Sequence, residues 1–176
     1  MRDLDLRKVY QLMEPGPVVL LTKAHKGRSN VMTMSWHMML EFDPPQIACV
    51  VSSANHSFKA LSATGQCVIA LPALELASNV VRVGNCSGQD VDKFDAFGLS
   101  RMPSDRVAPP LVAECFANLE CVVIDKRLVS RFNLFVLEVI KAWRDPSRRN
   151  PKTIHHRGYG TFAVDGQIIK LRSRKK

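Results

Sequence analysis

Short runs of apolar and β-branched residues, each ended by turn-forming residues, dominate the first third of the chain. Residues 17–23 and 31–42 are two such runs, and the polar segment 25–30 between them predicts a β-hairpin. The Asp-Pro-Pro sequence at 43–45 ends the second run because proline lacks an amide donor, and residues 47–52 then have the pattern of a buried strand. This part of the chain is therefore predicted to be β-rich.

Three short helices are predicted in the middle of the chain. Residues 58–64 favour helix, follow side chains of the capping type and end at Gly65. Residues 73–84 place apolar side chains at three- and four-residue spacing, which is typical of a helix. A third helix is expected to be capped by Asp90 and closed by Gly98.

The second half returns to strand patterns. Residues 117–125 and 133–143 are the two longest strand candidates, joined by a charged turn. The dipeptide at 165–166 is Asp-Gly, flanked by residues 161–164 and 167–171, and predicts a second hairpin. Seven or eight strands with three short helices do not show the regular alternation of a doubly wound sheet. A mainly β protein is expected, an antiparallel β-barrel with inserted short helices, and the length of its last long strand is compatible with a barrel that dimerises.

Composition and charge narrow the class of protein. The 176 residues, 46% of them hydrophobic and 23% charged, suit a single soluble domain over residues 1–176, and no apolar run reaches the ~18 residues of a membrane span. Residues 1–10 lack the apolar core of a secretory signal, so a cytoplasmic location is expected. The net charge of +9, which includes a basic tail at residues 172–176, suits an anionic partner: nucleic acid, a membrane surface or a phosphorylated small molecule.

The five cysteines and several missing motifs exclude common kinds of site. An odd number of cysteines without C-x-x-C spacing encodes neither a disulfide framework nor a zinc site, so reduced, buried thiols are expected. The dinucleotide motif G-x-G-x-x-G after a strand, the P-loop and the hydrolase motif G-x-S-x-G are all missing from the sequence.

A cluster of hydroxyl and amide side chains lies between the strand at 47–52 and the helix at 58–64. A helix N-terminus offers free backbone amides and the positive end of a dipole, so these side chains could complete an anion site, most naturally for a phosphate. The same residue types also make an ordinary helix cap, which on the residue pattern alone is the favoured interpretation. The residues concerned are Ser52, Ser53, Asn55, His56 and Ser57.

Residues 30–37 alternate polar and apolar side chains. On a strand, Thr33, Ser35 and His37 would form one row, facing either solvent or a polar, ligand-filled space. Trp36 favours the second interpretation, because the residues around it suit contact with a planar ring: Met34, Met38 and Met39.

Two further segments carry candidate binding groups. The polar turn at residues 85–88 comes shortly before Lys93 and Phe94, which could equally be a loop followed by an amphipathic helix. Residues 155–160 form a glycine-rich basic loop that begins with two adjacent histidines. Adjacent side chains of an extended chain point to different sides, so a shared metal is not expected there.

Five motifs occur in a fixed order: NVMTMSW at 30–36, DPP at 43–45, SSANHSF at 52–58, NCSGQDVDKF at 85–94 and HHRGYGTFAVDG at 155–166. Together they resemble the flavin reductase-like, FMN-binding split-barrel family, and in particular its flavoredoxin-type members. The similarity extends from about residue 15 to residue 171. It implies a six-stranded Greek-key split barrel that forms a homodimer and holds FMN noncovalently near the subunit interface.

The resemblance also implies which residues hold FMN. The first motif would line the isoalloxazine and the ribityl chain, and the third would hold the phosphate. Lys93 and Phe94 would lie close to the flavin, with His155 at the edge of the pocket. The full set comprises Asn30, Met32, Thr33, Met34, Ser35, Trp36, Ser52, Ser53, Asn55, His56, Ser57, Cys86, Ser87, Lys93, Phe94 and His155.

An FMN-dependent oxidoreductase is the function that the resemblance implies, with NADH or NADPH as hydride donor. The flavin carries the redox chemistry, so no catalytic acid, base or nucleophile is expected, and Lys93 is a candidate cation that tunes the flavin. The alternative is a flavoredoxin-type electron-transfer protein that receives electrons from a partner protein. A nucleic-acid-binding barrel is disfavoured because the basic residues are dispersed and few aromatic residues lie among them. No membrane partner is expected.

Overall fold

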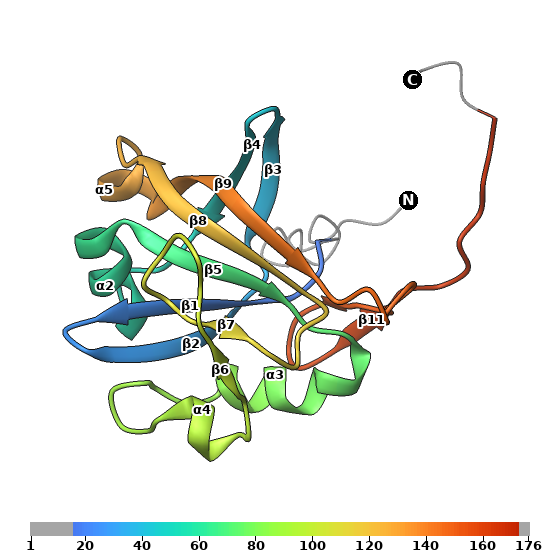
Figure 1. Ribbon diagram of the computed structural model, residues 1–176, viewed down its shortest axis with the longest axis horizontal. Coiled ribbons are helices and arrows are strands. Elements are labelled where there is room, and N and C mark those ends of the chain that lie inside the picture. Colours follow the sequence, from blue (N-terminus) through green and yellow to red (C-terminus); the bar gives the residue numbers. More distant parts are fainter. Residues whose placement is uncertain (1–15, 173–176) are drawn as a thin grey trace, which may run out of the picture.

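The computed structural model describes residues 16–172, and its centre is a seven-stranded antiparallel sheet with the order β2-β1-β5-β8-β9-β4-β3 (Figure 1). The N-terminal segment 1–10 and all but the first residue of the predicted basic tail lie outside the described residues. The strands of the sheet are β1 (Val19–His25), β2 (Arg28–Met34), β3 (His37–Phe42), β4 (Pro45–Val50), β5 (Gln66–Leu71), β8 (Ala117–Asp125) and β9 (Leu134–Arg144).

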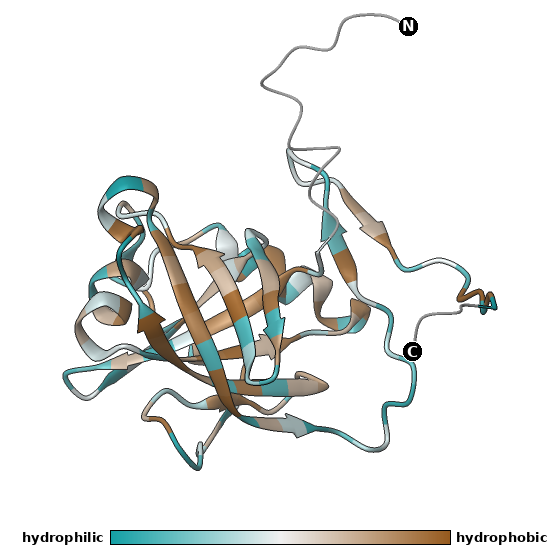
Figure 2. Ribbon diagram, turned by 90° about the horizontal axis from the view of Figure 1, so that it is seen from above, coloured by the Kyte–Doolittle hydropathy of each residue, from teal (hydrophilic) through white to brown (hydrophobic). Residues whose placement is uncertain are grey.

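Two small sheets and a few short helices complete the described fold. Strand β6 (Arg101–Met102) pairs with β7 (Leu111–Val112), and β10 (Ile154–His156) pairs with β11 (Phe162–Val164). The helices are α2 (His56–Thr64), α3 (Ala77–Gly84), α4 (Lys93–Ala96) and α5 (Val129–Phe132), with a 3₁₀ turn η2 (Leu74–Leu76) before α3. Figure 2 shows hydrophobic residues concentrated in the strands of the main sheet, whereas the connecting loops are mostly hydrophilic.

The main sheet is curled into a split barrel. Its two edge strands, β2 and β3, are consecutive in the chain and are joined by residues 35–36 alone. In a flat seven-stranded sheet the edges would lie roughly 29 Å apart, at about 4.8 Å per strand. The connection from Met34 to His37 can span at most about 11 Å, so the sheet must curl until its edges meet. The unpaired edge of β2 is where the candidate site lies.

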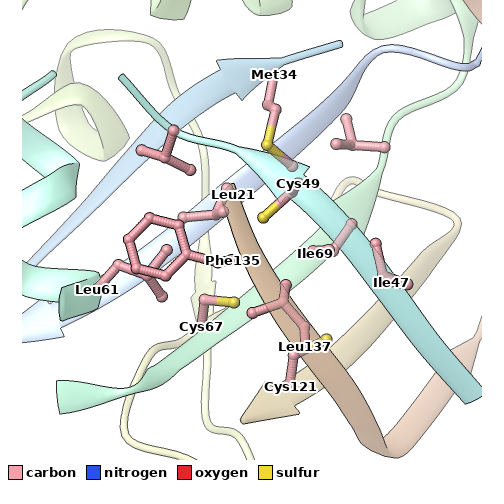
Figure 3. Packing of buried hydrophobic residues seen from close by; sticks show 12 residues of the cluster. Leu21, Met34, Ile47, Cys49, Leu61, Cys67, Ile69, Cys121, Phe135 and Leu137 are labelled. Atoms are coloured by element: carbon pink, nitrogen blue, oxygen red, sulfur yellow. The ribbon is translucent and has the colours of Figure 1, made fainter. Parts of the chain in front are cut away.

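Two hydrophobic clusters hold the barrel together. The first fills the barrel interior with side chains from β1, β2, β4, β5, β8 and β9 and from α2. Figure 3 shows Leu61 and Phe135 packed beside Leu21. Cys49, Cys67 and Cys121 belong to this cluster and are fully buried, as the sequence predicts, whereas Cys86 is only half-buried. The second cluster covers the outer face of β1, β2 and β5, where α3 and α4 pack (Figure 1). Because both faces of β1 are covered, its first five residues are all buried.

The mainly β fold with inserted short helices is confirmed, but several boundaries differ from those predicted. The run 31–42 is broken at residues 35–36 into two strands that lie at opposite edges of the sheet. The main sheet has seven strands instead of six. The third helix is capped by Asp92, whose carboxylate accepts from the amides of Phe94 and Asp95, and not by Asp90. The charged turn before β9 contains the four-residue helix α5.

The predicted hairpin at Asp165-Gly166 is wrong. Strand β11 pairs with the earlier β10, and no described residue after Val164 is in a strand. The physical reason is the Asp165 carboxylate, which accepts from the amide and hydroxyl of Thr153 at 2.7 and 2.8 Å and lies 2.8 Å from His155 Nε2. These contacts tie residue 165 to β10, so the chain cannot turn back on itself there.

A buried carboxylate anchors the long loop between β6 and β7. Glu120 is fully buried on β8 and accepts hydrogen bonds from the amides of Asp105, Arg106 and Val107 and from the Trp143 indole, at 2.6–3.1 Å. Burial alone would raise the pKa of Glu120, but these four donors outweigh it and leave the pKa below its usual value. The charged form is therefore the one that the fold stabilises.

We expect Glu120→Gln to lower the free energy of unfolding at pH 7 by about 2–4 kcal/mol, because the new amide group would face amide donors. The folded-state pKa lies below the unfolded one, so the carboxylate's contribution is complete above about pH 4.3 and is lost as the pH falls through the folded pKa. Urea unfolding of both proteins should therefore give curves that converge in acid. Glu138→Gln is the control, because this half-buried carboxylate has no hydrogen bond or ion pair with residues 16–172. It should change the free energy of unfolding little. Equal losses from the two changes would contradict this account.

Candidate functional site

A cavity of about 300 Å³, here called the central cavity, lies beside the unpaired edge of β2. Three segments far apart in the sequence meet there: the edge strand, the start of α2, and the segment from the end of α3 to α4. Its lining residues are Asn30, Met32, Thr33, Ala54, Asn55, His56, Ser57, Val83, Gly84, Asn85, Cys86, Ser87, Gly88 and Lys93.

Asn30 and Ser57 form a buried polar pair in this cavity. Their side chains are 4% and 2% exposed, and Asn30 Nδ2 donates to Ser57 Oγ at 3.3 Å. Gly88 lies directly against this pair, since a Cβ atom on it would stand 2.1 Å from Asn30 Oδ1. Only glycine allows this close approach, so the backbone of residue 88 and the Asn30 amide form one wall of the cavity.

The start of α2 presents free backbone donors to the cavity. Asn55 occupies the N-cap position with an extended backbone, but its side chain makes no capping hydrogen bond. The amides of His56 and Ser57 have no hydrogen-bond acceptor among residues 16–172, as expected for the first turn of a helix. The ordinary side-chain cap, which was the alternative interpretation of this sequence, is therefore not formed. The backbone amides of His56 and Ser57 can instead donate to an anion.

Lys93 brings a buried positive charge to the same cavity. It is 4% exposed, and its Nζ donates to the carbonyl of Val83 at 2.7 Å, which leaves two ammonium hydrogens for other acceptors. Burial lowers the pKa of Lys93, and the neighbouring Cys86 sulfur acts in the opposite direction. A buried lysine with a single neutral partner is suited to an anionic ligand.

Positive charges also act on His56, which lines this cavity. Burial is the largest cause that lowers the pKa of His56, followed by the charges of Lys23, Lys93 and Arg28, whereas Asp90 raises it. Burial first and these positive charges second therefore hold His56 toward its neutral form.

An outer cavity of about 540 Å³ continues from the central one and shares Met32, Thr33 and Asn55 with it. Two aromatic side chains on its rim, Trp36 and Phe132, are more than half exposed. The other lining residues are Met34, Ser35, Val50, Ser52, Arg131 and Asn133. The flat apolar groups at this end suit a planar ring.

A third cavity, of about 640 Å³, continues from the opposite side of the central cavity and shares Asn30, His56 and Gly88 with it. We call it the cationic cavity because lysine and arginine side chains line it. The remaining lining residues are Lys23, His25, Lys26, Gly27, Arg28, Ser29, Gln89, Asp90, Val91, Asp92, Asp95 and Arg101.

Most of the predicted site residues lie together at the central and outer cavities. This group comprises Asn30, Met32, Thr33, Met34, Ser35, Trp36, Ser52, Asn55, His56, Ser57, Cys86, Ser87 and Lys93. Thr33 also has a structural role, because its hydroxyl donates to the Val80 carbonyl at 2.6 Å and fixes α3 against β2.

Three predicted residues do not line these cavities. Phe94 is fully buried in the second core cluster, and Ser53 is exposed outside all three cavities. His155 lies on β10, where Nε2 is 3.0 Å from the Thr153 hydroxyl as well as close to Asp165. His37, predicted to share a row with Thr33, instead bonds the Pro17 carbonyl at 2.8 Å because the strand breaks before it.

Several lining residues could not be selected from the sequence. Gly88 lay inside a recognised motif, but its contact with Asn30 depends on tertiary structure. Arg131 and Phe132 belong to the segment predicted as a turn, and Asn133 to the start of the predicted strand. They reach the outer cavity because β9 pairs with its neighbour β4, which places Leu134 beside Val50. The sequence pattern predicts Lys23 as the last residue of a strand and gives no indication of a binding role.

The described part of the chain has neither a membrane-spanning helix nor a metal-binding cluster. None of its helices is long and apolar enough to cross a membrane. Residues 16–172 also contain no group of three or more histidine, cysteine, aspartate or glutamate side chains placed to hold a metal ion.

Comparison with known proteins gives consistent matches. The model of the flavin reductase like domain family matches residues 12–163. The uncharacterized protein YddH of Escherichia coli (strain K12) is 29% identical over an alignment of 182 positions, which covers 94% of this chain and 95% of that protein. The crystal structure of an FMN-binding domain of a flavin reductases-like enzyme from Shewanella baltica OS155 is 28% identical, with a TM-score of 0.84 and 96% of each chain covered. Flavoredoxin of Desulfovibrio vulgaris (Miyazaki F) has the same fold, with a TM-score of 0.83, 20% identity, and coverage of 99% of this chain and 96% of that one.

Proposed function

The chain belongs to the flavin reductase-like domain family, and from this premise we propose that it is an FMN-binding oxidoreductase that takes a hydride from NADH or NADPH. The observation that carries the proposal is the central cavity, where free helix amides, a buried Asn–Ser pair and a buried lysine meet. The Shewanella baltica domain, described as FMN-binding, supports the choice of flavin.

The residues present fit FMN. The amides of His56 and Ser57, with the Ser57 hydroxyl, would hold the phosphate at the start of α2. The segment of β2 from Asn30 onward would line the ribityl chain, and the outer cavity at Trp36 would receive the ring. Because residue 88 is glycine, the cavity wall has no side chain at the point where one would overlap Asn30 and obstruct the bound FMN.

Bound FMN would supply the redox chemistry, accepting a hydride from the nicotinamide donor. The chain's own residues bind and orient it. Lys93, held by the Val83 carbonyl, would place its charge beside the flavin and favour negative charge there. Trp36 and Phe132 would shield the ring from one side.

Anaerobic mixing of the FMN-loaded protein with NADH or NADPH tests the proposed reaction. We expect the visible flavin absorbance to be lost within seconds with at least one donor. A flavin that stays oxidised with both donors, yet is reduced by a protein donor, would instead assign the chain to electron transfer of the flavoredoxin type.

We also propose a homodimer, because the edge strand β3 exposes a row of large apolar side chains. Exposed edge strands of this kind are covered in stable proteins. Phe42 is 87% exposed, the side chains of Met38, Met39 and Leu40 are 43–60% exposed, and Trp36, directly before the strand, is 58% exposed. Figure 1 shows β3 and β4 projecting beyond the rest of the sheet.

We expect the double change Met39→Glu with Phe42→Glu to convert a dimer of twice 19.7 kDa into a monomer. Charged groups cannot be buried against a second copy without a large cost. Light scattering after size-exclusion chromatography measures the mass directly. Leu74→Glu, at an apolar residue that is 37% exposed outside this strand, serves as the control and should leave the dimer intact. A wild-type chain that is monomeric at all concentrations would refute the proposal.

Gly88→Ala is expected to weaken FMN binding at least about tenfold, because the new methyl group must displace the Asn30 side chain from Ser57. Titration of the apoprotein with FMN, followed by flavin fluorescence, measures the change. Gly166→Ala is the matched control, since no atom lies within 4 Å of a Cβ at that position. Unchanged affinity in Gly88→Ala would show that the Asn30 wall does not contact the flavin.

A further inference from the structure

The cationic cavity contains an unusual buried charge. Lys23 is 5% exposed, and its ammonium has no hydrogen bond or ion pair with any of residues 16–172. It is also the cross-strand partner of Asn30 in the β1–β2 ladder, so its side chain stands next to the wall of the central cavity. Burying an ammonium group without a partner costs free energy, so a buried ammonium is normally paired with an anion.

A second cation lies beside it. Arg28 is the first residue of β2, is exposed, and has no ion pair within the described part of the chain. Burial is the main cause that lowers the pKa of Lys23, and the charge of Arg28 lowers it further, which shows that the two cations act on one another. An anion between them would relieve this repulsion.

The carboxylates of the cavity do not neutralise these two cations. Asp92 and Asp95 both bind the Arg101 guanidinium, which also lies over the Phe94 ring. Asp90 is the remaining carboxylate of a lining that also contains Lys23, Lys26 and Arg28, so it is one negative charge beside three positive ones. The cavity therefore keeps an excess of positive charge on the side of the β1–β2 hairpin.

The cationic cavity begins where the flavin phosphate would end. It shares Asn30, His56 and Gly88 with the central cavity, whereas the outer cavity continues from the other side. One phosphate at the start of α2 would leave Lys23 and Arg28 uncompensated. A volume of about 640 Å³ is also enough for a group larger than a phosphate.

We propose that Lys23 and Arg28 form a second phosphate subsite, which receives the adenosine-side phosphate of a dinucleotide. This inference rests on the proposed flavin site in the central cavity. Two ligands share this chemistry: FAD, whose flavin half would occupy the central and outer cavities, and a nicotinamide dinucleotide that approaches bound FMN.

The test uses ADP as the probe for the subsite. FMN-loaded protein is titrated with ADP by calorimetry, for the wild type and for Lys23→Met, Arg28→Met and the control Lys59→Met, an exposed lysine outside the cavity. We expect Lys23→Met and Arg28→Met each to weaken ADP binding at least about tenfold, the scale of a hydrogen bond to a charged group. Neither these two changes nor the control should alter FMN affinity more than about twofold. Arg28→Met lies on the surface, so it tests the subsite even if Lys23→Met were to fold poorly.

Two further measurements distinguish FAD from a nicotinamide dinucleotide as the ligand of this subsite. If FAD is the ligand, the apoprotein should bind FAD at least about fivefold more tightly than FMN, and Lys23→Met should abolish that difference. If a nicotinamide dinucleotide is the ligand, FAD should have no advantage, and Lys23→Met should raise the KM for the reduced donor.

Two results would overturn the subsite. The first is ADP affinity that is insensitive to both substitutions. The second is a loss of FMN affinity in Lys23→Met as large as the loss of ADP affinity, which would assign Lys23 to the flavin phosphate itself. An apoprotein that binds no FMN would instead refute the proposed function, and ADP titration of that apoprotein would still test the subsite.

Discussion

Replacing Ser57 with aspartate is expected to weaken FMN binding at least about hundredfold. Residue 57 lies in the first turn of α2, where its hydroxyl and two free amides would hold the phosphate. An aspartate there would repel the phosphate and would take the same amide donors for its own carboxylate. The fold should survive, because a carboxylate is favourable at a helix N-terminus and can still accept from Asn30.

A matched control for this change exists on the neighbouring helix. Ser78 is the second residue of α3, as Ser57 is of α2, but it is exposed and lines none of the three cavities. Ser78→Asp should leave the affinity unchanged, and both variants should unfold at temperatures close to the wild type. If Ser57→Asp kept its FMN affinity, the phosphate could not lie at the start of α2.

The second large effect is expected from Lys93→Met. Loss of the buried charge should weaken binding of the anionic reduced flavin by about tenfold to a hundredfold more than binding of the oxidised form. For a two-electron couple this ratio lowers the midpoint potential by roughly 30–60 mV, at about 30 mV per tenfold change. Anaerobic titration with a reference dye measures the potential.

Lys126→Met controls for the loss of a lysine whose ammonium binds a carbonyl. Lys126 Nζ donates to the Ser62 carbonyl at 2.7 Å, as Lys93 Nζ does to Val83, but it is exposed and lies outside the cavities. Its replacement should not move the potential. A Lys93→Met protein with the wild-type potential would show that this charge does not act on the flavin.

The elements that the sequence predicts well are those determined by local pattern. The capping-type residues before α2 and the glycine after it are local signals, and Gly65 does adopt the left-handed conformation that ends the helix. The strand patterns around β5, β8 and β9 are equally local, because each alternates or runs apolar over its whole length.

The elements that it predicts poorly depend on contacts between distant residues. The Asp-Gly pair at 165–166 has the local signature of a hairpin, yet the contact of Asp165 with Thr153 redirects the chain. The run 31–42 is continuous in hydropathy, but the barrel requires its two halves at opposite edges of the sheet. Tertiary contacts override the local preference in both cases.

The same distinction applies to the candidate site. The sequence predicts the group at residues 52–57 because a helix start after a strand offers free backbone amides, which attract an anion. Lys23 has no local signal, since a lysine at the end of an apolar strand is ordinarily a solvated residue. Its burial becomes visible only once β1 is covered on both faces and α2 packs beside it.

The affinity of the apoprotein for FMN compared with riboflavin, which lacks the phosphate, tests the central claim most directly. If the phosphate is held at the start of α2 next to Ser57 in the cavity that Lys93 lines, calorimetry should find one FMN per chain. Riboflavin should then bind at least about a hundredfold more weakly, a difference of about 2.7 kcal/mol. Equal affinities for the two flavins, or no FMN binding, would contradict the account.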